Sequence, residues 1–247
     1  MSQTDKNTLQ KSFSEKFNNF RQDMSDNPDK AKAFKELVDV GQDPNVMVIS
    51  CSDSRLVINQ LFQADPGDVF ISRHVANLVI PYDSEKTAEN PLAGAVEYAV
   101  DVLNVKDIII KGHTGCGGIG ALVNAVDVMQ REKPENYRFS DVEKWVLNAK
   151  DVILENQGMK LDPDFVEQMG RHVLVWSLEN LKEYPSVRKG LEDGTLGIHA
   201  WQFDMHNLQI IAYDEDSNSF KSLTDDNVPH SPDIQISSDQ DDMSSEP

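Results

Sequence analysis

The sequence has few cysteines, few basic residues and no long apolar run, and each of these absences excludes a class of protein. Two cysteines among 247 residues are too few for a disulfide-stabilised scaffold, so we expect them to serve as thiols or metal ligands. The longest apolar runs, such as Val46–Ile49, are far shorter than the ~20 residues that a membrane-spanning helix needs. We therefore expect no membrane association.

Basic residues are outnumbered by acidic ones, with 23 Lys and Arg against 42 Asp and Glu and a formal net charge of −19. No basic cluster stands apart from the rest, which argues against nucleic acid as a partner. Residues 1–30 contain neither the apolar core of a secretory signal nor an arginine-rich transit segment, so we expect a cytoplasmic protein. The content of 39% hydrophobic and 26% charged residues is typical of a folded globular chain.

The acidity is concentrated at the carboxyl terminus. Residues 214–247 contain ten Asp and Glu against the single Lys221, which accounts for almost half of the net charge. From Asp225 onward there is no Lys or Arg and few large apolar side chains, a composition that buries too little surface to fold. We expect residues 224–247 to form a disordered acidic tail.

The amino-terminal segment, residues 1–40, has the pattern of two amphipathic helices. The first extends from about Thr8 to Met24 and carries one apolar stripe, formed by Leu9, Phe13, Phe17 and Phe20. The second ends at Gly41, a residue typical of a helix C-terminus. We expect a helical arm whose apolar stripe needs a surface to cover.

Residues 41–223 alternate short apolar strands with amphipathic helices. Strands are predicted at Val46–Ser50, Asp68–Ser72 and Asp107–Lys111, and a helix capped by Asn90 at Pro91–Asn104. This alternation predicts an α/β domain with a largely parallel central sheet flanked by helices on both faces.

Later segments complete the predicted domain. Ser140 and Glu143 form a capping box that opens a further helix, and Gly117–Met129 has a helical pattern. Three short segments near the carboxyl end predict antiparallel strands, at Leu196–Phe203, Leu208–Tyr213 and Phe220–Leu223.

The two cysteines follow two of the predicted strands. Cys51 comes where Val46–Ser50 ends, and His113 and Cys116 come where Asp107–Lys111 ends. Ligands of parallel sheets bind beyond the carboxyl ends of the strands, so these three side chains can converge there. Two thiolates and an imidazole favour zinc, and three protein ligands leave the open fourth position of a catalytic site.

Asp53 and Arg55 follow Cys51 at alternate positions and can face the same side of an extended segment. Arg55 can hold the Asp53 carboxylate bidentately, which keeps it ionised and oriented to accept a proton from water on the metal. Without that pairing, Asp53 could instead become a fourth zinc ligand and close the site.

Other interpretations of these cysteines are weaker. A single buried cysteine is usually a small apolar residue, and each short motif alone is weak evidence for a metal. The spacing from Cys51 to Arg55 is too short for the phosphate loop of a cysteine phosphatase. No Cys-x-x-Cys pair of a thiol-redox enzyme is present.

Two sequence blocks resemble the signature of the β-class carbonic anhydrases. They are Cys51-Ser-Asp53-Ser-Arg55 and Gly112-His113-Thr-Gly-Cys116-Gly-Gly-Ile119. Between them, the Pro66-Gly-Asp68 segment and the segment that begins Arg73-His-Val-Ala-Asn77 are also similar to the family. The resemblance covers about Gln42 to Tyr213, and it leaves the amino-terminal helices and the acidic tail outside.

The resemblance implies one zinc ion per chain, bound by Cys51, His113 and Cys116. It also implies reversible hydration of CO2 to bicarbonate and a proton, by attack of zinc-bound hydroxide, with Asp53 and Arg55 as the catalytic pair. The positions of substrate-pocket residues in the subtype with a permanently open site are filled here by Gln42, Phe70, Tyr98 and Gly117.

Three positions bear on the subtype and on proton transfer. Members with a regulatory bicarbonate site carry Trp and Tyr where this sequence has Val48 and Phe203, so the resemblance implies no such site here. His74 stands where the family usually has Asn. It could shuttle protons, with its unperturbed pKa of ~6.5, but a hydrogen-bonding role in place of the asparagine is the favoured interpretation.

The resemblance also implies self-association as a homodimer or a dimer of dimers. The apolar stripe of the arm then fits a partner subunit, although packing on its own domain stays an open alternative. Two other functions stay open as well. They are hydrolysis of a related small heterocumulene such as carbon disulfide, and a non-catalytic zinc-binding module of the same fold.

Overall fold

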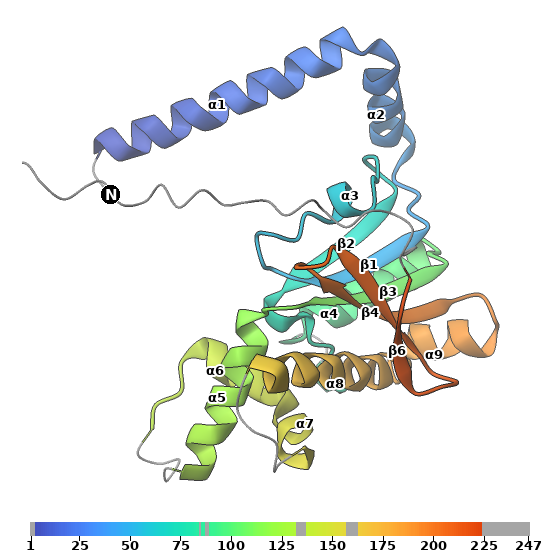
Figure 1. Ribbon diagram of the computed structural model, residues 1–247. Helices are drawn as coiled ribbons and strands as arrows, with labels where there is room; N and C mark the ends of the chain where they lie inside the picture. The colour runs from blue at the N-terminus through green and yellow to red at the C-terminus, as the bar shows by residue number, and fades with distance from the viewer. Residues whose placement is uncertain (1–2, 84, 87–88, 132–136, 157–162, 224–247) are drawn as a thin grey trace, which may run out of the picture.

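The computed structural model describes residues 3–83, 85–86, 89–131, 137–156 and 163–223, and a six-stranded sheet forms its centre (Figure 1). The spatial order of the strands is β2-β1-β3-β4-β5-β6. In chain order they are β1 (Val46–Cys51), β2 (Val69–His74), β3 (Asp107–His113), β4 (Gly197–Asp204), β5 (Gln209–Asp214) and β6 (Ser219–Ser222). The first four pair in parallel, and β5 and β6 are antiparallel, which confirms the predicted fold class.

The three strands predicted near the carboxyl end are confirmed as β4, β5 and β6, each antiparallel to the next. In addition, β4 is parallel to β3, a pairing that the sequence pattern did not predict. The reason is that the chain between β3 and β4 crosses the sheet through several helices, and a strand that follows a helical crossover returns in the same direction.

Helices pack on the sheet and divide its core into clusters (Figure 1). On one face, Met47 and Ile49 of β1 pack in a cluster with residues from α4, α8 and α9. On the opposite face, Val48 and Ile109 pack with Ile58 of α3. The helices of the domain are α3 (Ile58–Leu61), α4 (Pro91–Glu97), α5 (Gly117–Arg131), α6 (Asp141–Val146), α7 (Lys150–Glu155), α8 (Pro163–Lys182) and α9 (Pro185–Glu192).

Two predicted helices are interrupted. The helix predicted at Pro91–Asn104 is α-helical to Glu97 and continues as a π-helical segment at Tyr98–Val102. Asn90 caps it as predicted, accepting a hydrogen bond from the backbone N–H of Leu92 at 3.2 Å.

The helix that opens at Ser140 has the predicted capping box, but a 3₁₀ segment at Leu147–Ala149 separates α6 from α7. A sequence period near 3.6 does not distinguish an α-helix from a short π-helical or 3₁₀ segment, because the apolar positions of all three face the same core.

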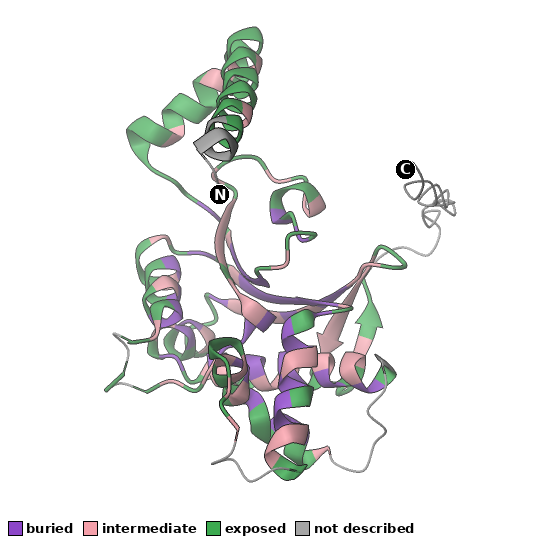
Figure 2. Cartoon of the chain, turned by 90° about the vertical axis from the view of Figure 1, so that its left-hand side faces the viewer, coloured by how far each residue is buried: buried purple, intermediate pink, exposed green. Residues whose placement is uncertain are grey.

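The arm consists of α1 (Gln3–Asp26) and α2 (Pro28–Val40) and extends away from the sheet (Figures 1 and 2). Its predicted stripe is exposed, with Phe13 and Phe17 each 61% accessible. Among the described residues, no helix is both long and apolar enough to cross a membrane. The predicted disordered tail, residues 224–247, lies outside the described residues.

The start of α5 lies against the segment that follows β2. A Cβ atom at Gly118 would lie 2.8 Å from the Ala76 Cβ and 3.1 Å from the Ala76 backbone nitrogen. Ala76 itself has a positive φ of 62°, so the backbone on both sides of this contact is constrained. Only glycine at position 118 allows this approach.

We predict that Gly118→Ala destabilises the fold by about 1–3 kcal/mol, because the added methyl group overpacks this contact. Gly120→Ala is the matched control, since a Cβ there meets nothing within 4 Å. That control should stabilise the helix by about 0.5–1 kcal/mol. Urea unfolding measures both, and equal stability of the two variants would contradict the packing argument.

Candidate metal centre

The structure brings the three predicted metal ligands together at the carboxyl edge of the sheet. Cys51 is the last residue of β1, His113 is the last of β3, and Cys116 precedes α5. Their ligand atoms all lie within 4.8 Å of one another, and all three residues are buried. The convergence predicted from the sequence is therefore present in the fold.

The distance between the two sulfur atoms fits a shared zinc ion. Thiolates bound to one tetrahedral zinc at about 2.3 Å lie about 3.8 Å apart. The Sγ atoms of Cys51 and Cys116 are 3.9 Å apart. The chain thus holds them at the spacing of two ligands rather than at the ~2.05 Å of a disulfide.

Backbone N–H groups stabilise negative charge on both sulfur atoms. The N–H groups of Asp53 and Ala76 donate to Cys51, and those of Gly118 and Ile119 donate to Cys116. The backbone at Ala76, with its positive φ, and the first turn of α5 therefore both direct N–H groups toward the metal centre. They turn amide protons toward sulfur atoms that would otherwise be buried as poorly solvated thiolates.

The contact between the two thiols shifts their pKa values in opposite directions. The hydrogen bond from Cys116, together with hydrogen bonds from the backbone N–H groups of Asp53 and Ala76, lowers the pKa of Cys51. The hydrogen bond to Cys51 and burial raise the pKa of Cys116. A cation that binds both sulfur atoms removes this competition, because it stabilises the two thiolates together.

The His113 ring is oriented for metal binding. Its Nδ1 lies 2.9 Å from the Thr114 carbonyl oxygen, which can only accept, so Nδ1 carries the proton. Nε2 then presents a lone pair, and it is a buried atom without a hydrogen-bond partner in the described structure. An unpartnered buried nitrogen beside two sulfur atoms is the donor set expected of a zinc site.

Asp53 and Arg55 form the predicted bidentate pair beside the ligands. Arg55 Nε lies 2.9 Å from Asp53 Oδ1 and Nη2 lies 2.7 Å from Oδ2. The Arg55 hydrogen bonds hold the pKa of the Asp53 carboxyl well below its usual range. Asp53 Oδ2 is 3.8 Å from His113 Nε2, so this carboxylate borders the ligand cluster.

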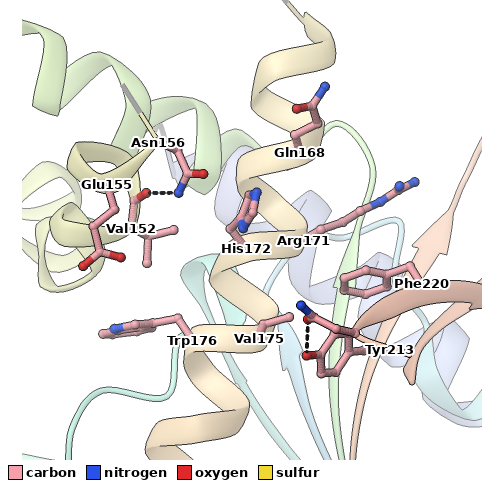
Figure 3. A pocket seen from close by; sticks show the side chains of 11 residues that line it. Val152, Glu155, Asn156, Gln168, Arg171, His172, Val175, Trp176, Tyr213 and Phe220 are labelled. Atoms are coloured by element: carbon pink, nitrogen blue, oxygen red, sulfur yellow. Dashed lines mark hydrogen bonds between the residues drawn. The ribbon is translucent and has the colours of Figure 1, made fainter. Parts of the chain in front are cut away.

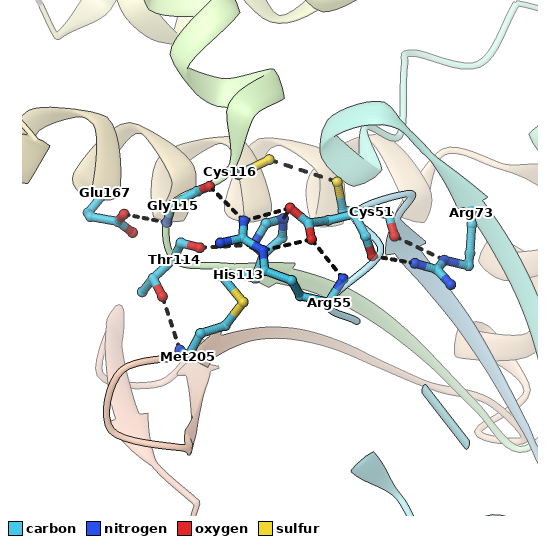
Figure 4. A network of polar contacts seen from close by, with 10 residues as sticks. Cys51, Arg55, Arg73, His113, Thr114, Gly115, Cys116, Glu167 and Met205 are labelled. Carbon is cyan, nitrogen blue, oxygen red and sulfur yellow. Dashed lines mark hydrogen bonds and ion pairs between the residues drawn. The ribbon is translucent and has the colours of Figure 1, made fainter. Parts of the chain in front are cut away.

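Sequence reasoning assigned no role to Arg73, which fixes the loop after β1 (Figure 4). Its Nε donates to the Cys51 carbonyl oxygen at 3.1 Å and its Nη2 donates to the Asp53 carbonyl oxygen at 2.7 Å. Arg73 opens the segment 73–77 that resembles the family, and this resemblance was the only indication in the sequence that it has a role. Its contacts depend on the pairing of β1 with β2, which places the end of one strand beside the other.

The structure does not bring most of the predicted pocket residues to the ligand cluster of the same chain. Gln42 precedes β1 and is exposed at the opposite end of that strand. Phe70 pairs with Met47 in the sheet, four positions before the register of Cys51, which is about 13 Å along a strand. The Phe70 and Tyr98 rings contact each other, with centroids 5.9 Å apart.

Gly117 and His74 lie close to the metal centre. Gly117 is exposed and directly follows Cys116 at the start of α5. His74 Nε2 lies 2.7 Å from the Leu78 carbonyl oxygen, its ring packs edge-on against Trp145, and burial lowers its pKa. These contacts support the hydrogen-bonding interpretation of His74 over proton shuttling.

A cavity of about 520 Å³ lies elsewhere, between α7, α8 and the β5–β6 hairpin (Figure 3). Residues such as Glu155, His172, Trp176 and Tyr213 line it, and none of the three metal ligands does. The cavity is therefore separate from the metal centre.

Comparison with protein families identifies one match that spans most of the chain. The family model described as carbonic anhydrase matches residues 46–210. This interval contains the three ligands of the metal centre together with Asp53 and Arg55.

Individual relatives agree with that match. A carbonic anhydrase of Pseudomonas aeruginosa is 32% identical over 200 residues, which cover 80% of this chain and 86% of the relative. The mitochondrial beta carbonic anhydrase 6 of Arabidopsis thaliana is 34% identical over 180 residues, covering 72% of this chain and 59% of the relative.

Solved structures are similar as well. The β-carbonic anhydrase CcaA superposes with a TM-score of 0.74 at 27% identity, covering 87% of this chain and 99% of that one. A structure described as one of two tetrameric β-carbonic anhydrases of Sordaria macrospora has a TM-score of 0.64 at 26% identity, covering 89% and 98% of the two chains.

We predict that Cys116→Ala loses bound zinc on dialysis against a mild chelator, because one of three ligands is removed. The matched control is His74→Asn, which changes a nearby residue outside the ligand set. Metal analysis should find about one zinc ion per chain in the parent and the control. Equal zinc retention in Cys116→Ala and the control would show that the ion binds elsewhere.

Proposed function

The chain belongs to the carbonic anhydrase family, as a member of its β class, and we propose that it hydrates CO2 reversibly at the Cys51, His113 and Cys116 centre. The observation that carries this proposal is the combination of three convergent ligands with the Asp53–Arg55 pair beside them. The donor set fits one zinc ion per chain, because tetrahedral zinc takes thiolate and imidazole ligands.

Zinc supplies the Lewis acidity that lets a water molecule attack CO2 near neutral pH. Cys51 and Cys116 contribute two negative charges, so the centre is formally neutral and acidifies water less than a three-histidine site would. A group that accepts a proton from the water molecule therefore helps the reaction. Asp53 is the candidate, since it is ionised and borders the ligands.

Arg55 determines what Asp53 can do. Two hydrogen bonds from its guanidinium and one from its backbone N–H, at 3.0 Å, hold the Asp53 carboxylate. A carboxylate held in this way accepts a hydrogen bond from the attacking water and does not turn to become a fourth ligand. We propose the open form of the site on this ground.

The separation of Phe70 and Tyr98 from the ligands of their own chain supports a site completed by a second copy. The exposed Tyr98, 45% accessible, and its neighbour Phe70 could form an apolar wall for CO2 only beside another chain's metal centre. Gln42 is exposed as well and could bind bicarbonate there. We propose a homodimer or a dimer of dimers, in keeping with the tetrameric relatives.

The remaining parts of the chain fit this assembly. We propose that residues 1–40 form an arm that covers a partner subunit, because the apolar stripe is exposed on the isolated chain. Residues 41–223 form the catalytic domain and residues 224–247 an acidic tail. A reducing compartment such as the cytoplasm suits the site, since both cysteines must remain thiols to bind zinc.

Stopped-flow measurement of CO2 hydration tests the activity directly. We predict that the zinc-loaded protein hydrates CO2 and that Cys51→Ala abolishes the activity because it removes a ligand. Carbon disulfide is the second substrate to assay. A zinc-loaded protein that hydrolyses carbon disulfide but not CO2, or neither compound, would contradict the proposal and support one of the two alternatives.

Co-expression of two inactive variants tests the shared site. We predict that Cys51→Ala and Tyr98→Ala, each impaired alone, form mixed dimers with one intact site, and that equal co-expression restores about a quarter of parent activity. The control is a mixture of the two proteins prepared separately without subunit exchange. Activity that only equals the average of the separate variants would show that Tyr98 serves its own chain.

A further inference from the structure

Gly115, between the metal ligands His113 and Cys116, is held from two sides. Its backbone N–H donates to Glu167 Oε1 at 2.6 Å. Its carbonyl oxygen accepts from Arg55 Nη2 at 3.2 Å. Figure 4 shows Glu167 on one side of this loop and Arg55 on the other. With its positive φ of 64°, Gly115 presents its N–H and its carbonyl group to different partners.

Glu167 lies on α8, which is fixed to the same edge of the sheet by other contacts. The Leu174 side chain packs so closely on β3 that a Cβ atom at Gly112 would lie 3.1 Å from it. Arg171 Nε donates to Gln202 Oε1 at 2.8 Å, and Gln202 pairs with Gly112 in the sheet. The helix is thus a firm support from which Glu167 reaches the loop.

We propose that Glu167 is a positioning residue for the reaction, an inference that rests on the proposed function. Its carboxylate fixes the Gly115 N–H, so that the Gly115 carbonyl oxygen is held where Arg55 can donate to it. Arg55 in turn orients Asp53. These hydrogen bonds connect Glu167 on α8, through Gly115 and Arg55, to the Asp53 carboxylate at the metal centre.

The negative charge of Glu167 indicates that its contact with Gly115 has a functional role. Asp53 already brings one carboxylate to the neighbourhood of this loop, and a second carboxylate adds repulsion between the two. A glutamate in this place is tolerated because a short, charge-assisted hydrogen bond orders the loop. Glutamine at position 167 would retain an acceptor for the Gly115 N–H, whereas alanine would not.

The experiment compares Glu167→Ala with Glu167→Gln, and Glu179→Ala is the matched control. Glu179 is exposed on the same helix and pairs with Lys182. We measure kcat and KM for CO2 hydration, zinc content, and the absorption spectrum of the cobalt-substituted protein. The thermal midpoint of each zinc-free variant shows whether the fold is intact.

We expect Glu167→Ala to lower kcat about tenfold, the scale typical of residues that orient a metal site, with KM changed less. Asp53 acts on the attacking water rather than on CO2 binding, which is why kcat changes more. The cobalt spectrum should shift, because the loop between two ligands relaxes. Glu167→Gln should restore both properties, and Glu179→Ala should match the parent.

A Glu167→Ala protein with parent kcat and cobalt spectrum would overturn the inference, as would a glutamine variant impaired as severely as the alanine one. If Glu167→Ala does not fold, Glu167→Asp replaces it, because the shorter side chain withdraws the acceptor from Gly115. An inactive parent protein with full zinc content would contradict the proposed function instead, and the cobalt spectra would still test the contact between Glu167 and the loop.

Discussion

The parallel pairing of β1 with β3 is the constraint on which the metal centre depends. The last pair of the register is Ser50 with Lys111, so Cys51 on one strand and His113, two residues beyond Lys111 on the other, both lie at the same carboxyl edge. A shift of one residue would turn one of these side chains to the opposite face. The buried side chains of both strands oppose such a shift, because each packs in a particular cluster on its own face of the sheet. Packing in the sheet interior thereby determines where the ligands lie.

Burial of two thiolates requires compensation, and backbone N–H groups supply part of it. A buried charge without partners is costly, yet both sulfur atoms receive N–H groups from the loop after β1, from Ala76 and from the start of α5. The close approach of Gly118 to Ala76 brings the last two of these donors together. The same tight packing therefore stabilises the fold and holds the N–H groups near the two sulfur atoms. A side chain at position 118 would disturb both.

The sequence allowed the ligands and the Asp53–Arg55 pair to be predicted because they follow recognisable strands at short spacing. The helices of the arm and the positions of the first three strands were predictable for a similar reason, since local periodicity determines them. The direction of β4 relative to β3 was not, because it depends on the path of a long crossover. The roles of Glu167 and Arg73 could not be predicted either, since each contacts a loop that is distant in the chain. Phe70 and Tyr98 were recognised only as a resemblance, and their place relative to the ligands became visible only in the fold.

The exposure of Arg55 indicates that its pairing with Asp53 serves orientation rather than stability. The side chain of Arg55 is 57% accessible, and ion pairs this exposed contribute little to folding because water competes for both partners. Three hydrogen bonds nevertheless converge on one carboxylate, and a fourth connects the guanidinium to Gly115. In the proposed function the Asp53 carboxylate, which is 18% accessible, has to meet a water molecule at the metal, so complete burial cannot hold it. Hydrogen bonds from the planar Arg55 guanidinium orient the Asp53 carboxylate instead. The guanidinium is in turn held by its hydrogen bond to the Gly115 carbonyl oxygen.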